Sequence, residues 1–164
     1  MSRLKLVALG TVMALGVVAC GSQDHSAHEA VGGAPADHAM AGEVPGAPGV
    51  AAEADQTIEV IASDELTFDP AEIELDEGEV VTFVIRNAGE TDHEFVLGDE
   101  AYQEMHEADM REGHSMMDMQ HGVSLAPGET KEITWAFTEA GEVLFGCHQP
   151  GHYEGGMVGT ITVS

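Results

Sequence analysis

Basic residues are scarce in this sequence of 164 residues: five Lys and Arg stand against 30 Asp and Glu, which gives a formal net charge of −25 at pH 7. Nucleic acids carry a dense negative charge that such a surface repels, so the composition excludes a nucleic-acid-binding protein. The same charge attracts cations and proteins with basic surfaces. We therefore expect partners of those two kinds.

Apolar runs are short as well. The run over residues 6–19 falls below the roughly 20 residues that a membrane-spanning helix needs. Arg3 and Lys5 precede it, and a basic start, a short apolar run and small residues at its end are typical of a secretory signal. The run ends in Val-Val-Ala-Cys, which resembles the lipobox of bacterial lipoproteins. We expect residues 1–19 to be removed and Cys20 to carry the lipid anchor; plain cleavage nearby is the alternative.

Cysteine is nearly absent, with two residues in the chain. If Cys20 is bonded to lipid, Cys147 is the one thiol left, and no intrachain disulfide can form. An exported protein with a lone thiol leaves four explanations for it: an intermolecular disulfide, burial as a small apolar residue, a catalytic nucleophile, or coordination of a metal as a thiolate. The neighbours of Cys147 favour the last.

The composition divides the chain into three parts. After the signal, residues 20–55 are rich in Gly, Ala, Pro and acids and poor in core-forming side chains, which predicts a flexible, lipid-anchored tether. Its histidines, His25 and His28 among them, are solvated or bind metal transiently. Residues 56–164 hold short β-branched and aromatic runs separated by turn residues, which predicts one antiparallel β-sandwich domain. We expect strands at 57–62, 67–68, 72–75, 79–86, 94–97, 122–125, 131–137, 141–147 and 157–163.

One stretch, residues 99–121, lacks the β pattern. It begins as an acidic helix that Asp99 caps, with Ala101, Met105 and Ala108 on one face, and continues as a loop after Gly113. We therefore predict a short helical insertion, rich in Met and His, within the β domain.

The chemistry concentrates near the C-terminus. Cys147, His152 and Met157 follow a Cys-x4-His-x4-Met spacing on a loop between two predicted strands. A second imidazole, His93, lies on a predicted loop just before another strand. Two imidazoles and a thiolate with a weak axial thioether form the ligand set of a blue-copper site, because these ligands suit both copper oxidation states.

These motifs resemble the cupredoxins, the family of plastocyanin, azurin, auracyanin and rusticyanin, over nearly all of residues 56–164. The resemblance implies a Greek-key β-sandwich that binds one type 1 copper through His93, Cys147 and His152, with Met157 as the axial ligand. The alternative is a core thiol with ordinary loop histidines and a packed methionine. The loop has no second cysteine for a dinuclear purple site, and the chain has no His-x-His pair for a multicopper oxidase, nitrite reductase or copper-zinc superoxide dismutase.

Two residues depart from the family pattern. Plastocyanin and azurin have Asn after the first histidine ligand and Ser or Thr after the cysteine, whereas this chain has Glu94 and His148. We predict that their side chains join the two ligand loops through a charge-assisted hydrogen bond that orients the thiolate. In the alternative, both side chains point to solvent.

Methionine and histidine also gather in the insertion. Because thioethers bind Cu(I), the cluster resembles an auxiliary site that would take additional Cu(I) beside the type 1 copper; the alternative is gap filling and flexible surface. The auxiliary residues are Met105, His106, Met110, His114, Met116, Met117, Met119 and His121.

The sequence predicts a binder or carrier rather than an enzyme, because it shows no nucleophile with a general base and no phosphate-binding loop. The main expectation is one-electron transfer in the bacterial cell envelope, with a basic heme or copper protein as the redox partner. The alternative is copper tolerance, in which the protein binds, buffers or sequesters periplasmic copper. A metal-free structural lipoprotein would leave Cys147 unexplained. We expect a lipid-anchored monomer on the periplasmic or cell-surface side of a membrane, with no other membrane contact.

Overall fold

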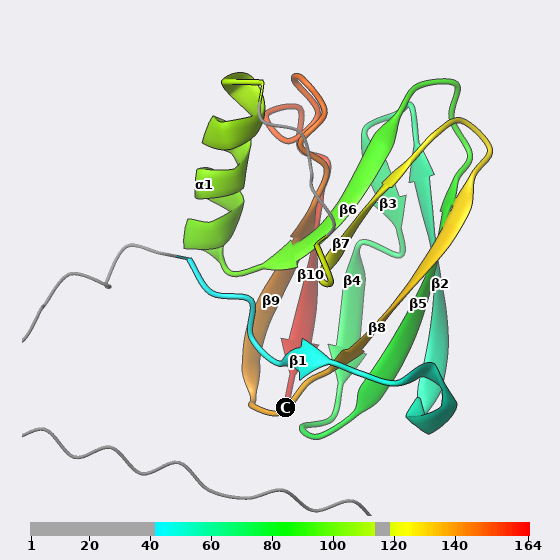
Figure 1. Cartoon of the computed structure of the whole chain (residues 1–164), viewed down its shortest axis with the longest axis vertical. Coiled ribbons are helices and arrows are strands. Elements are labelled where there is room, and N and C mark those ends of the chain that lie inside the picture. Colours follow the sequence, from blue (N-terminus) through cyan, green and yellow to red (C-terminus); the bar gives the residue numbers. More distant parts are fainter. Residues whose placement is uncertain (1–41, 114–118) are drawn as a thin grey trace, which may run out of the picture. The chain divides into compact units, whose positions relative to one another are not determined.

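The computed structural model describes residues 42–113 and 119–164, which form two facing β-sheets with one α-helix alongside (Figure 1). Two of the nine predicted strands have the predicted bounds, and the other seven differ by one residue at one or both ends. The strands are β1 Ala47–Pro48, β2 Gln56–Ser63, β3 Thr67–Asp69, β4 Glu72–Leu75, β5 Val80–Asn87, β6 His93–Gly98, β7 Gly122–Leu125, β8 Thr130–Ala136, β9 Gly141–Gly146 and β10 Val158–Val163.

The strand order is β1-β8-β5-β2-β3 in one sheet and β4-β10-β9-β6-β7 in the other. This β-sandwich confirms the predicted fold class. The sheets are mixed rather than purely antiparallel, because β2 pairs in parallel with β5, and β4 with β10. Each parallel pair joins strands that are distant in the chain order, a pairing that turn signals between neighbouring strands do not predict.

The core fills the space between the sheets with all five phenylalanines of the chain. Phe95 on β6 is fully buried, and its ring centroid lies 5.8 Å from that of Phe68, 5.5 Å from Phe83 and 5.0 Å from Phe145. Such aromatic pairs add stability beyond the area that they bury. Cys147 and Met157 belong to the same buried cluster, so the predicted ligands rest on a rigid base.

The folded domain begins earlier than predicted. Residues 47–48, expected in the tether, form β1 and pair with β8, and the short 3-10 helix η1 Ala51–Glu53 follows. The indole nitrogen of Trp135 donates a hydrogen bond to the carbonyl oxygen of Pro45 at 2.7 Å. These contacts order residues whose composition alone predicts flexibility. Strand pairing uses main-chain hydrogen bonds, so it places little demand on the type of side chain.

The helix α1 Glu100–Arg111 lies beside β6 and β9 (Figure 1), and Asp99 caps it as predicted by accepting the Tyr102 main-chain N–H at 2.7 Å. Ala101, Met105 and Ala108, which were predicted to share one face, are all exposed, whereas the buried residues of the helix are polar. The surface that the helix covers carries polar side chains, so its polar face turns inward. Within the described ranges, neither α1 nor η1 has the length and apolar character of a membrane span.

We expect Phe95→Ala to lower the free energy of unfolding of the copper-free protein by about 3–5 kcal/mol, since it leaves a cavity among three other phenylalanines. Chemical denaturation followed by circular dichroism measures the change. Val50→Ala is the matched control, because Val50 is 57% exposed and should cost less than about 0.5 kcal/mol. Equal effects of the two changes would contradict this description of the core.

Candidate metal centre

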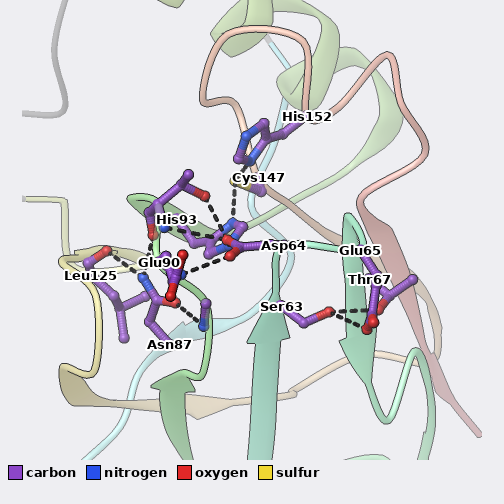
Figure 2. A network of polar contacts seen from close by, with 12 residues as sticks. Ser63, Asp64, Glu65, Thr67, Asn87, Glu90, His93, Leu125, Cys147 and His152 are labelled. Atoms are coloured by element: carbon purple, nitrogen blue, oxygen red, sulfur yellow. Dashed lines mark hydrogen bonds and ion pairs between the residues drawn. The ribbon is translucent and has the colours of Figure 1, made fainter.

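His93 is the first residue of β6 rather than part of a loop, and its side chain is fully buried. The loop that leads to it is held by Asn87 at the end of β5 (Figure 2). The Asn87 amide donates to the carbonyl oxygens of Thr91 at 2.7 Å and Leu125 at 3.1 Å, and its own oxygen accepts the Gly89 N–H at 2.8 Å. These bonds fix the entry of the chain into β6 and therefore the direction of the His93 ring.

The other predicted ligands lie on the loop between β9 and β10. The Cys147 N–H donates to the Met157 carbonyl at 3.1 Å, and the Met157 N–H donates to the His152 carbonyl at 3.0 Å. The main chain of Met157 is thus bonded to both other ligand residues of this loop. Gly151 and Gly156 adopt φ of 82° and 95°, a region that favours glycine, so the tight turns depend on these residues.

The structure brings three donor atoms together: the Cys147 sulfur and one nitrogen each from His93 and His152 all lie within 4.8 Å of one another. The Cys147 Sγ is 3.8 Å from His93 Nδ1 and 3.3 Å from His152 Nδ1 (Figure 2). Cys147 and His93 are buried, whereas His152 is half-buried. One imidazole therefore faces the interior and the other reaches toward solvent.

Burial raises the pKa of the Cys147 thiol to about 11, although the main-chain N–H groups of Gln149 and Glu94 oppose the shift. The Glu94 N–H donates to the sulfur at 3.2 Å. A thiolate at this position needs a cation beside it, because its desolvation is otherwise uncompensated. The donor set of one sulfur and two imidazole nitrogens fits a soft to borderline metal such as copper.

Glu94 and His148 are both buried, but they do not form the predicted side-chain bond with each other. Glu94 accepts hydrogen bonds from Ser124 and Gln149, each at 3.3 Å, and the His148 ring is bonded to residues of α1. This corrects the predicted tie between the loops. The loops are joined instead by the Gln149 amide, which donates to the Glu94 carboxylate, and by the Glu94 main-chain N–H, which donates to the cysteine sulfur.

Two residues of α1 are hydrogen-bonded to the two ring nitrogens of His148. Gln103 donates to the carbonyl oxygens of Val96 at 2.9 Å and Leu144 at 3.3 Å, so its amide oxygen faces His148 Nε2 at 2.6 Å. Because that oxygen only accepts, Nε2 carries the hydrogen. Glu107 lies 2.8 Å from Nδ1. Burial lowers the pKa of His148 to about 4 and raises that of Glu107, and both directions favour the uncharged pair.

The structure places the predicted auxiliary residues in different surroundings. His114, Met116 and Met117 lie outside the described residues. Met105 is exposed and Met110 half-buried, whereas the Tyr102 hydroxyl lies 3.1 Å from Met119 Sδ and 2.8 Å from His121 Nε2.

His106 is buried at the same side of the helix, where its ring stacks on Tyr102. Its Nε2 and the Glu94 Oε2 lie 3.9 Å apart, and in the described part of the chain these are the two buried side-chain atoms without a hydrogen-bond partner. Burial lowers the pKa of His106 to about 4 and raises that of Glu94. Both directions favour the uncharged forms of the two groups.

Sequence reasoning missed three residues that support the centre: Asp64, which lies 3.3 Å from His93 Nε2, and the helix residues Gln103 and Glu107. Nothing distinguishes Asp64 or Glu107 from the chain's other acids by spacing. Gln103 and Glu107 are four residues apart and so share one helix face, but this spacing identifies them only once the helix is known to bury that face.

Comparison with known proteins supplies the family. Residues 55–164 match the family described as copper-binding proteins of the plastocyanin/azurin family. The copper-resistant cuproprotein CopI of Rubrivivax gelatinosus is 42% identical over 98% of this chain and 96% of its own length. CopI of Pseudomonas aeruginosa is 39% identical over 74% of this chain and 83% of its own length.

Solved structures of blue copper proteins share the fold. Reduced auracyanin from Roseiflexus castenholzii has a TM-score of 0.60 and 25% identity, covering 68% of this chain and 98% of its own. Auracyanin B has a TM-score of 0.59 and 26% identity, covering 77% of this chain and 99% of its own.

We expect Gln103→Leu to lower the free energy of unfolding by about 2–4 kcal/mol, because it removes a hydrogen-bond partner of a buried carbonyl oxygen, of a half-buried carbonyl oxygen and of the His148 ring. Urea unfolding of the copper-free protein measures the loss. Glu104→Leu on the exposed side of the same turn is the control, with an expected change within about 0.5 kcal/mol. A loss for Gln103→Leu no larger than for the control would show that the network contributes nothing.

Proposed function

Because the chain belongs to the plastocyanin/azurin family of copper-binding proteins, we propose that His93, Cys147 and His152 hold its copper as a type 1 centre, with Met157 as the weak axial ligand. The observation that carries this proposal is the convergence of one thiol sulfur and two imidazole nitrogens within 4.8 Å. The full burial of Met157, and its main-chain bonds to Cys147 and His152, support the axial role. Copper bound there supplies a reversible one-electron couple.

The protein's own residues suit electron transfer rather than catalysis of a reaction. The ligand loops are fixed by main-chain bonds and by Asn87, so little rearrangement is needed between oxidation states. His93 is buried, whereas His152 is half-buried among exposed residues of its loop. We infer that electrons enter and leave through the His152 ring edge. The Cys147 sulfur and the His93 ring are both fully buried, which fits an electron carrier.

A redox partner with a basic surface fits the charge of the molecule. The described basic residues are already paired: Arg86 lies 4.0 Å from Glu59, Lys131 lies 3.3 Å from Glu129, and Arg111 pairs with Glu107 and Glu154. The field around the protein is therefore negative, and it would steer a basic heme or copper protein toward the surface. Salt screens such steering, so the association rate should fall as ionic strength rises.

Copper tolerance is a second candidate function, favoured by the similarity to copper-resistant cuproproteins. Thioethers and imidazoles of the insertion would bind cuprous ion beside the type 1 centre. Met119 and His121 meet at the Tyr102 hydroxyl, which brings two of the predicted auxiliary residues together. The two functions are compatible, because one centre can carry electrons while the insertion binds additional Cu(I).

We also propose that the protein is exported and anchored by lipid at Cys20, with a tether that lets the domain stand away from a bacterial membrane. The signal-like residues 1–19 and the Val-Val-Ala-Cys motif support this placement. An exported location agrees with a copper-binding function in the cell envelope. We propose a monomer, which leaves the His152 edge accessible to a partner.

The chain from residue 21 onwards should develop strong visible absorption from thiolate-to-copper charge transfer after one equivalent of Cu(II) is added. Cys147→Ser should abolish this band, because serine offers no thiolate. Ser124→Ala is the control: its hydroxyl contacts Glu94 and no predicted ligand, so the band should persist. A band of unchanged strength in Cys147→Ser would refute the proposed centre.

Replacing Met116, Met117 and Met119 together by Leu should remove Cu(I) bound in excess of the first equivalent, because leucine has a similar volume but no sulfur. Competition with a chromophoric Cu(I) chelator measures the stoichiometry. Met40→Leu, outside the insertion, should leave it unchanged. Equal Cu(I) stoichiometry and affinity in the triple variant and the unchanged protein would count against a copper-storing role for the insertion.

A further inference from the structure

The turn between β2 and β3 supplies a carboxylate to the predicted metal centre. Asp64 accepts hydrogen bonds from the Glu90 N–H at 2.7 Å, the Thr91 N–H at 3.3 Å and the Thr91 hydroxyl at 2.7 Å, and its Oδ1 lies 3.3 Å from His93 Nε2 (Figure 2). One side chain therefore binds both the His93 ring and the loop that leads to it. The cluster joins a strand turn to a ligand that lies 29 residues further along the chain.

The His93 ring is oriented by its two nitrogens. Nδ1 faces the Cys147 sulfur at 3.8 Å, and Nε2 faces Asp64. If Nδ1 binds a metal, Nε2 carries the ring's hydrogen and donates it to the carboxylate. The Glu90 main-chain N–H, followed by the Thr91 hydroxyl, lowers the pKa of Asp64 to about 2, so the acceptor stays ionised at neutral pH.

The surrounding backbone is shaped for this approach. A Cβ at Gly89 would lie 2.2 Å from Asp64 Oδ1, so only glycine at that position lets the carboxylate reach the loop. Two residues after Asp64, Leu66 adopts φ of 58°, a left-handed conformation that is rare for leucine. Its Cδ1 lies 2.5 Å from where a Cβ of Gly155 would be, on the loop that carries His152. The same turn thus contacts both ligand loops.

We propose that Asp64 is the positioning residue of His93: its carboxylate fixes the ring with Nδ1 toward the metal and favours Cu(II) over Cu(I). This inference rests on the proposed ligand set. A carboxylate that accepts the second N–H of a ligating imidazole fixes the ring and strengthens it as a donor, and loss of such a partner typically changes metal affinity by about 10–100-fold. A stronger donor and an added negative charge both stabilise the more highly charged copper ion.

Asp64 differs in kind from the other acids of this acidic protein. Within the described ranges, it is the carboxylate that bonds to a ring of the proposed ligand set. Exposed carboxylates elsewhere act through solvent and are screened by salt. The effect of Asp64 should therefore depend on its hydrogen bond and exceed that of removing a charge nearby.

The test compares Asp64→Asn with Asp92→Asn in the copper-loaded protein. Both remove one negative charge near His93, but Asp92 is exposed and makes no hydrogen bond to the ring. Asp64→Asn should weaken Cu(II) binding relative to Cu(I) about tenfold, which raises the reduction potential by about 59 mV. Asp92→Asn should give less than half that shift, and the difference should persist at high salt.

A second measurement covers the case in which Asp64→Asn fails to fold. NMR of the unchanged protein, loaded with Cu(I), should show the His93 Nε2–H as a downfield, slowly exchanging proton. Equal potential shifts in the two variants, no shift in Asp64→Asn, or a rapidly exchanging Nε2–H would overturn the assignment of Asp64. Absence of the thiolate-to-copper band in the unchanged protein would instead refute the ligand set itself.

Discussion

A sulfur atom buried between two imidazoles is the constraint on which the arrangement of this protein depends. Cys147 Sγ lies in the apolar core, where burial raises its pKa to about 11, so its anionic form is stable only beside a cation. One ligand loop is held by main-chain hydrogen bonds of Met157, and the other by hydrogen bonds of the Asn87 side-chain amide. The aromatic core beneath them keeps these loops in place when no charge compensates the sulfur.

Polar side chains buried around the centre extend this constraint into the helix. The α1 helix turns Gln103 and Glu107 inward, where they satisfy both nitrogens of His148, the residue after the cysteine. On the surface, Arg111 of the same helix pairs with Glu154 of the ligand loop. The helix α1 is therefore joined to the loop that carries Cys147 and His152 by buried hydrogen bonds and by an exposed ion pair.

The charge of the molecule and the geometry of its centre suit the same function. An excess of acids attracts copper ions and basic proteins over a distance, whereas the half-buried His152 limits electron exchange to one short edge. Membership of the plastocyanin/azurin family and similarity to copper-resistant cuproproteins agree with this combination. Electron transfer and copper handling then use the same buried sulfur.

Local patterns in the chain were sufficient for nine strand positions, the cap at Asp99 and the candidate ligands His93, Cys147, His152 and Met157. Short β-branched runs, turn residues and ligand spacing are properties of neighbouring residues. The Cys-x4-His-x4-Met spacing identified copper because few other sites need a thiolate, an imidazole and a thioether on one loop.

Contacts between distant segments escaped this reasoning. The parallel strand pairs, the strand β1 within the predicted tether, the inward polar face of α1 and the carboxylate of Asp64 beside His93 all depend on which surfaces meet after folding. An acid in a turn and a glutamine on a helix look alike in any sequence until a partner many residues away gives them a hydrogen bond. The local sequence therefore determined which residues could bind the metal, whereas tertiary packing determined which residues support and orient them.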